Sequence, residues 1–162
     1  MRDKQVVERP LDKIDLRILK YLQNNGRMSM TELADKVGLS TTPCTERVRK
    51  LERDGIIEGY YARLNPQAMN SSLLVFVEIK LAAKSGDIFD SFRREVQKLP
   101  EVMECHLVSG EYDYLLKARI PDMSMYRKLL GDILLKLPHA NESRSYVVME
   151  EVKETLALPI PD

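Results

Sequence analysis

The fold is decided by Gly38-Leu39-Ser40-Thr41-Thr42-Pro43-Cys44-Thr45-Glu46-Arg47-Val48-Arg49-Lys50-Leu51-Glu52, a stretch in the first third of the 162-residue chain. Cys44, Val48 and Leu51 recur at helical spacing, so they predict a helix with one buried face. Ser40 or Thr42 can cap this helix, and Pro43 is tolerated in its first turn. Gly38 ends a preceding helix with a left-handed turn, so two helices meet across three residues.

Two more helices are predicted on the N-terminal side of this one. The first is capped by Asp12 and carries one apolar stripe, formed by Leu11, Ile14, Ile18, Leu19 and Leu22. The second opens with Ser29 and Glu32 in the form of a capping box and continues through Leu33, Ala34 and Val37. A helix, a tight glycine turn and a second helix form a helix-turn-helix pattern, although a plain three-helix bundle fits the same spacing.

The outer face of the third helix favours the helix-turn-helix. It carries short hydroxyls and long cations without an apolar residue, namely Thr41, Thr42, Thr45, Arg47, Arg49 and Lys50. Such a face can meet the phosphates and base edges of DNA. The charge balance agrees, because residues 1–64 carry 13 Lys+Arg against 10 Asp+Glu, whereas residues 65–162 carry 12 against 15.

The rest of the chain predicts a second domain. Residues 56–64 are rich in strand formers and predict a strand, which leads through Asn65-Pro66 and Asn70-Ser71-Ser72 into a linker. From there the pattern predicts strands over 73–82, 102–108, 112–120 and 143–152, with helices over 87–99 and 123–137. This βαββαβ order is that of a ferredoxin-like domain, so the fold class is α+β.

Several of these strands are apolar on both faces. Val75, Val77 and Ile79 point to one side of the sheet, while Leu74 and Phe76 point to the other. Two helices can cover one face, so a second subunit is expected to cover the other. The sequence therefore predicts a homodimer formed through the sheets.

Several classes of protein are excluded. No apolar run approaches the roughly 20 residues of a membrane span, and the charged segment Met1–Pro10 lacks the core of a secretory signal, so a cytoplasmic location is expected. Cys44 and Cys105 lack metal-ligand spacing, as do His106 and His139, and no metal site is predicted. Phosphate-loop, HExxH and GxSxG motifs are absent, and an RNA-binding role would need exposed stacking aromatics that the strands lack.

Five stretches in this order closely resemble the Lrp/AsnC family of leucine-responsive, or feast/famine, transcriptional regulators. They are Leu11–Asp15, Gly38–Glu52, Leu73–Glu78, Cys105–Tyr114 and Tyr146–Glu151. The resemblance implies a winged-type helix-turn-helix domain (1–60), a strand and linker (61–72), a RAM effector-binding and oligomerisation domain (73–152) and a tail (153–162). It also implies a cytoplasmic, nucleoid-associated regulator that binds double-stranded DNA as a homodimer assembling to an octamer.

The resemblance places an amino-acid effector site in the second domain. It falls on Ser109, Gly110, Tyr112 and Asp113, with Leu107, Met123, Tyr146, Val147 and Val148 as further candidates. Amides around Gly110 can bind the carboxylate of an amino acid, and Asp113 can bind its ammonium group. Leucine and methionine both suit an apolar wall such as Leu107 or Met123, and the residues alone also fit a simple hairpin turn.

The leading hypothesis is thus a DNA-binding regulator whose assembly or DNA affinity responds to leucine or methionine, without a catalytic site or cofactor. An enzyme remains as an alternative, because some proteins that resemble this family decarboxylate a modified tetrapyrrole. That activity would need a large pocket lined by cations and histidines. The chain has two histidines and a complete basic helix.

Overall fold

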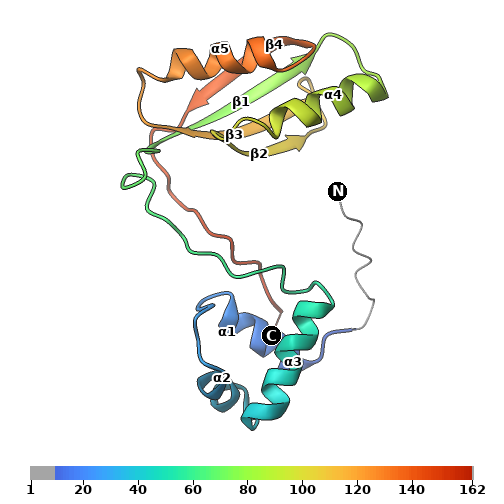
Figure 1. The fold of residues 1–162 in the computed structure, drawn as a ribbon, viewed down its shortest axis with the longest axis vertical. Coiled ribbons are helices and arrows are strands. Elements are labelled where there is room, and N and C mark those ends of the chain that lie inside the picture. Colours follow the sequence, from blue (N-terminus) through green and yellow to red (C-terminus); the bar gives the residue numbers. More distant parts are fainter. Residues whose placement is uncertain (1–9, 162) are drawn as a thin grey trace. The chain divides into compact units, whose positions relative to one another are not determined.

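A computed structural model of the chain describes residues 10–161, the side chain of Leu134 apart (Figure 1). Residues 1–9, which hold most of the charged segment Met1–Pro10, lie outside the described residues, as does residue 162. Two compact units are present. The helical unit comprises residues 10–63 and 154–161, and the sheet unit comprises Leu64–Lys153.

The helical unit contains the three predicted helices, α1 (Lys13–Leu22), α2 (Met30–Val37) and α3 (Thr41–Arg53). Asp12 caps α1 in a complete capping box, because its Oδ1 accepts from the Asp15 amide at 2.8 Å and the Asp15 carboxylate accepts from the Asp12 amide. Half of the box predicted for α2 is present, since Ser29 Oγ accepts from the Glu32 amide at 3.2 Å. Gly38 has φ +75°, as the turn into α3 requires.

One hydrophobic core joins the three helices. It contains Ile18, Leu22, Leu33, Ala34, Val37, Cys44, Val48 and Leu51, all buried. Cys44, Val48 and Leu51 come from a single face of α3, as their spacing predicts, so the opposite face of α3 is left to solvent. The core therefore fixes which side chains of α3 a ligand can reach.

The strand predicted over residues 56–64 is wrong, because residues 54–72 contain turns and irregular backbone without a strand. Ile56 and Ile57 instead pack against the helical core, and the Tyr60 hydroxyl donates to Glu52 Oε1 at 3.1 Å. Burial and the Glu52 carboxylate raise the pKa of Tyr60 to about 12. Strand-forming residues need a neighbouring strand, and the described chain supplies none at this place.

The sheet unit has the predicted βαββαβ order. Its elements are β1 (Leu73–Leu81), α4 (Gly86–Val96), β2 (Val102–Leu107), β3 (Tyr114–Ile120), α5 (Tyr126–Lys136) and β4 (Ala140–Val147). The strands lie in the order β2-β3-β1-β4, and all three pairings are antiparallel. β1 is central, with Val77 opposite Leu116 of β3 on one side and Ser145 of β4 on the other.

Both helices contribute to one core against the sheet. Phe92 and Val96 of α4 and Leu129 and Ile133 of α5 pack with alternate residues of the strands, among them Val75, Val77, Ile79, Leu116, Ala118 and Ile120. Phe92 is fully buried and stacks on Tyr114, with ring centroids 4.1 Å apart. This arrangement leaves the opposite face of the sheet without a covering helix.

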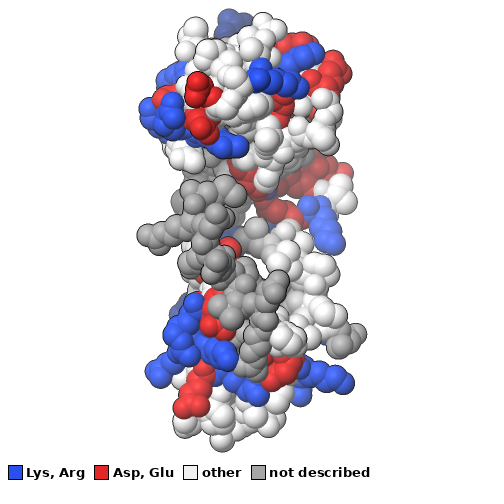
Figure 2. Space-filling model, turned by 90° about the vertical axis from the view of Figure 1, so that its right-hand side faces the viewer, with Lys and Arg blue, Asp and Glu red and all other residues white. Residues whose placement is uncertain are grey.

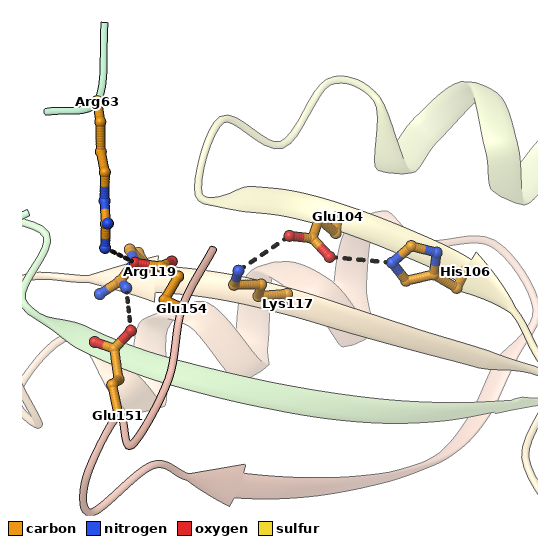
Figure 3. Close-up of polar contacts among 7 residues, drawn as sticks. All are labelled: Arg63, Glu104, His106, Lys117, Arg119, Glu151 and Glu154. Atoms are coloured by element: carbon orange, nitrogen blue, oxygen red, sulfur yellow. Dashed lines mark hydrogen bonds and ion pairs between the residues drawn. The ribbon is translucent and has the colours of Figure 1, made fainter. Parts of the chain in front are cut away.

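The uncovered face of the sheet is mixed rather than uniformly apolar. Leu74, Phe76, Leu115, Tyr146 and Val148 occupy it together with charged residues such as Glu78, Lys117 and Arg144. Glu104 on β2 accepts from Lys117 on β3 at 3.0 Å and contacts His106 Nε2 at 3.2 Å (Figure 3). The prediction of strands apolar on both faces is thus correct for parts of β1, β3 and β4.

Several predicted boundaries differ from the structure, and the last strand and the last helix show the physical reasons. The last strand spans Ala140–Val147 rather than residues 143–152, because Val148 makes the final pairing to β1 through its amide and the Leu74 carbonyl. The last helix begins at Tyr126 rather than Met123, because Asp122 holds residues 122–125 in a turn by accepting from the Ser124 amide and hydroxyl. Met123 therefore lies in a turn.

Among the described residues, no helix combines the length and the apolar character needed to cross a bilayer. The same residues contain no group of three His, Cys, Asp or Glu side chains arranged to hold a metal ion.

Candidate nucleic-acid interface and effector site

The outer face of α3 is formed by part of the predicted DNA-binding set. Thr41, Thr42 and Arg49 are exposed, whereas Thr45, Arg47 and Lys50 are half-buried. Figure 2 shows Lys and Arg side chains projecting from the helical unit, in the lower part of the view, with Asp and Glu side chains between them. The face is polar and basic without being uniformly positive.

Arg53 belongs to the same face and was missed from the sequence. It follows Arg49 by four residues, so the two cations lie on one side of α3, and Arg53 is exposed. Arg53 is the last residue of α3 and was not included in the predicted set. Its spacing of four residues from Arg49 is the signal that could have placed it on the same face.

Thr45, predicted to meet DNA, makes a hydrogen bond within its own helix in the structure. Its hydroxyl donates to the Thr41 carbonyl at 2.8 Å, one turn earlier in α3. The side chain thus bonds to its own helix. Thr41 and Thr42 stand in the first turn, where Ser40 does not cap the helix with its side chain, so backbone amides there can meet an anion.

Arg47 anchors α3 to the start of α1. Its guanidinium donates to Asp12 at 2.6 Å and to Asp15 at 2.7 Å. The Asp15 amide and then Arg47 hold the pKa of Asp12 below its usual value, and the same two carboxylates raise the pKa of Arg47. Arg47 was predicted to approach DNA, and in the structure its guanidinium joins α3 to the start of α1.

A second arginine joins α1 to α2. Arg17 donates to the Lys36 carbonyl at 2.5 Å and more weakly to the Val37 carbonyl, at the end of α2 where helix carbonyls lack partners. Arg17 and Arg47 therefore connect α1 to both helices of the helix-turn-helix. Neither contact has a signal in the local sequence, because the partners lie 19 to 35 residues away.

In the sheet unit, the turn from Ser109 to Asp113 joins β2 to β3. Ser109 and Gly110 are exposed. Gly110 has φ +132°, a backbone conformation that residues other than glycine rarely adopt. The Asp113 carbonyl accepts from the Val108 amide, and the Asp113 amide donates to Ile79, each at 2.9 Å. The turn is thus fixed to the end of β1.

The Asp113 carboxylate is buried and already paired. Its Oδ2 accepts from the Leu81 amide at 2.8 Å, and its Oδ1 pairs with the Lys84 ammonium at 2.8 Å. Burial raises the pKa of Asp113, but the Lys84 and Leu81 hydrogen bonds outweigh it, so the pKa lies below its usual value. The side chain of Lys84 is 62% exposed and that of Asp113 5%, so the lysine is the partner that can leave.

The predicted effector residues lie at two ends of the sheet. The turn residues and Leu107 lie near the Leu81 end of β1, whereas Val147 and Val148 pair with the Leu74 end. Met123 follows β3, whose last residue also pairs at that second end. Leu74 and Leu81 are separated by about 23 Å at about 3.3 Å per strand residue. One chain therefore does not bring all these residues into one site.

The two predicted tyrosines hold neighbouring strands. The Tyr112 hydroxyl donates to Glu142 at 3.0 Å, and the Arg144 guanidinium lies 5.2 Å from its ring centroid. The Tyr146 hydroxyl donates to Glu78 at 2.9 Å across the β1–β4 pair. Tyr112 is buried beside the turn, and Tyr146 is exposed on the uncovered face.

A helix-turn-helix unit with a polar third helix, followed by an antiparallel βαββαβ unit, is the arrangement of a DNA-binding regulator with an effector-binding domain. Residues 11–58 match a winged helix-turn-helix DNA-binding family, and residues 74–158 match the Lrp/AsnC ligand-binding domain. The chain belongs to the Lrp/AsnC family of transcriptional regulators. This assignment decides against the tetrapyrrole enzyme left open above.

The relatives agree in sequence and in structure. The chain is 61% identical over 150 residues to the leucine-responsive regulatory proteins of Salmonella typhimurium and Escherichia coli K12, covering 93% of this chain and 92% of each relative. A transcriptional regulator of Neisseria meningitidis, solved as a complex with L-Met, matches with a TM-score of 0.87 and 39% identity over 93% of this chain and 97% of its own. An AsnC family regulator of Agrobacterium tumefaciens matches with a TM-score of 0.88 and 38% identity, over 92% and 97%.

The Arg47 contacts predict a stability effect that Arg49 lacks. Arg47→Met should lower the free energy of unfolding by about 2 kcal/mol, because it leaves the buried Asp15 carboxylate unpaired. Arg49→Met should change it by less than about 0.5 kcal/mol. Urea unfolding followed by circular dichroism measures both, and equal effects of the two changes would contradict the anchoring role.

Acid should remove part of this stabilisation. The pKa of Asp12 is lowered in the folded state, so its contribution is complete above the unfolded value of about 4 and disappears as the pH falls through the folded value. Urea midpoints measured between neutral pH and pH 3 should therefore fall less in Arg47→Met than in the wild type.

Proposed function

We propose that the chain is a sequence-specific DNA-binding regulator whose assembly or DNA affinity responds to a small amino acid, leucine or methionine. The observation that carries this proposal is the combination of a packed, polar recognition helix with a separate unit of the Lrp/AsnC ligand-binding type. The leucine-responsive relatives and the regulator solved with L-Met support both amino acids. DNA binding implies a cytoplasmic, nucleoid-associated location.

DNA contact is assigned to the outer face of α3. Thr41, Thr42, Arg49, Lys50 and Arg53 reach the phosphates and base edges, while Arg47 and Thr45 act through the position and shape of the helix. We also propose that residues 154–161 are held by the DNA-binding domain and do not form a separate tail, since they pack with the helical unit.

Salt dependence tests this assignment. Each cation that contacts a phosphate contributes about 0.9 to the slope of log affinity against log salt, so Arg49→Ala and Lys50→Ala should together reduce the slope by about two for each α3 bound to the duplex. Lys128→Ala, on the exposed surface of α5, is the control and should leave the slope unchanged. The probe is the duplex that the wild-type protein selects from a random pool. An unchanged slope in the double variant would remove α3 from the DNA interface.

The effector's ammonium group is assigned to Asp113. The Lys84 ammonium now pairs with this carboxylate, and a bound amino acid would replace it with its own ammonium group. The exposed amides around Gly110 donate to the ligand's carboxylate, and an apolar side chain such as Leu107, which is 56% exposed, faces the ligand. Lys84 then acts as an internal competitor of the ligand.

Calorimetry against leucine and methionine tests this competition. Asp113→Asn should weaken binding by about tenfold or more, because the ligand's ammonium loses its charged partner. Lys84→Met should strengthen binding by a few-fold, since the competing ammonium is gone. Equal affinity in Asp113→Asn and the wild type would show that Asp113 closes the turn without touching the ligand, and weaker binding in Lys84→Met would contradict the competition.

The assembly is assigned to the uncovered face of the sheet. Phe76 and Tyr146 pair across β1 and β4 on this face, and a second copy would cover them in a two-fold homodimer. The separation of the candidate effector residues into two ends favours sites completed by a neighbouring copy, as in an octamer. Two recognition helices related by a dyad would read half-sites about one helical turn apart.

Sedimentation tests the dimer face. The wild type should sediment as a dimer or larger species at micromolar concentration, and Phe76→Asp should shift it toward monomer by placing a charge in the interface. Leu135→Asp is the control, because Leu135 is 87% exposed on α5, on the helix-covered side of the sheet. A monomeric wild type, or a Phe76→Asp protein that assembles like the wild type, would contradict this face.

A further inference from the structure

The C-terminal segment (residues 154–161) packs with the DNA-binding helices although it follows the sheet unit in sequence. The chain therefore passes between the two units twice, once after Arg63 and again after Lys153. In Figure 1 the last described residues lie beside α1, where Leu158 contacts Gln23. This second passage restrains the two units only while noncovalent contacts hold the segment against the helices.

The main contact is made by Gln23, the C-cap residue of α1. Its Nε2 donates to the Leu158 carbonyl, and its Oε1 accepts from the Leu158 amide, both at 3.1 Å. One side-chain amide thus satisfies the donor and the acceptor of a single residue, as a neighbouring strand would. This mode of binding recognises an extended main chain rather than a particular side chain.

Two ion pairs hold the approach to this contact. Arg63 donates to Glu154 at 2.8 Å, which joins the start of the segment to the end of the first connection. Within the sheet unit, Glu151 accepts from the buried Arg119 at 2.6 Å, which fixes the chain shortly after β4 (Figure 3). The segment is therefore held on the sheet side by Glu151 and on the helical side by Glu154 and Leu158.

The contact is suited to exchange. Leu156 and Leu158 expose 89% and 74% of their surface, so little apolar area is buried when the segment binds. Exposed hydrogen bonds and ion pairs contribute little net stability in water. Small changes around β4 can then alter whether the segment is bound.

We propose that Gln23 and Arg63 form a binding site on the DNA-binding unit for the chain's own C-terminal segment, and that this contact couples effector binding to DNA binding. The coupling part rests on the proposed amino-acid response. With the segment bound, two connections restrict the relative motion of the units. With it released, one linker remains, and a rearrangement of the sheet unit is transmitted poorly.

The experiment compares full-length variants with matched controls. Gln23→Ala removes both hydrogen bonds, and Leu158→Pro removes the main-chain donor. Gln97→Ala is the first control, since Gln97 is also an exposed C-cap glutamine, on α4, and its side chain makes no hydrogen bond among the described residues. Leu158→Ala is the second control, because it keeps the main chain that the site recognises.

Two readouts are taken on each protein. The first is the rate of limited proteolysis at the Leu156–Ala157 bond, which should rise several-fold in Gln23→Ala and Leu158→Pro but not in the controls. The second is the change in affinity for the selected duplex on adding saturating leucine or methionine. Coupling factors of about 5 to 150 are typical, and the two variants should lower the factor at least about threefold, while DNA affinity without the amino acid stays within about twofold.

The results test the binding site and the coupling separately. Equal proteolysis of the wild type and Gln23→Ala would overturn the binding site. Faster proteolysis with an unchanged amino-acid effect would overturn the coupling. If the wild type itself does not respond to either amino acid, the proposed function fails and the coupling falls with it, while the proteolysis rates still decide whether the segment is bound.

Discussion

The antiparallel pairing of β1 with β3 on one side and β4 on the other is the constraint on which the sheet unit depends. It places alternate residues of β1 against α4 and α5 and the others on the uncovered face. It also sends the turn before β3 to one end of the sheet and the last residues of β4 to the other. The turn around Gly110 and the start of the C-terminal segment are therefore separated by the same pairing.

In the helical unit, buried area and a few charged contacts have different tasks. Eight buried apolar residues hold the three helices together. Arg47 and Arg17 add directional hydrogen bonds from α3 and α1, and such bonds limit the orientations that the core would tolerate. The recognition helix thus owes its exposed face to packing and its orientation to ion pairs.

A regulator of this family must transmit a local event in one unit to a surface in another. Asp113 pairs with the Lys84 ammonium and also fixes the turn to β1 through the Leu81 amide, so the proposed exchange of its ammonium partner would act directly on this strand. The chain after β4 leaves the same sheet and reaches α1, so strand position and segment position are physically connected. Through such a connection, a ligand that binds one conformation of the sheet unit more tightly can change the helical unit as well.

The sequence by itself determined the elements that depend on local pattern. Helical spacing in α3, the Asp12 cap, the Gly38 turn and the βαββαβ order were all predicted, because periodicity and turn chemistry act over a few neighbouring residues. Only the tertiary structure decided which side chains and backbone groups each charged residue contacts. Arg47 reads as a DNA-facing cation until Asp12 and Asp15 are brought beside it, and Asp113 reads as a free carboxylate until Lys84 and Leu81 reach it. Residues 56–64 show the same limit, since strand-forming residues make a strand where another strand lies alongside, and long-range contacts decide that.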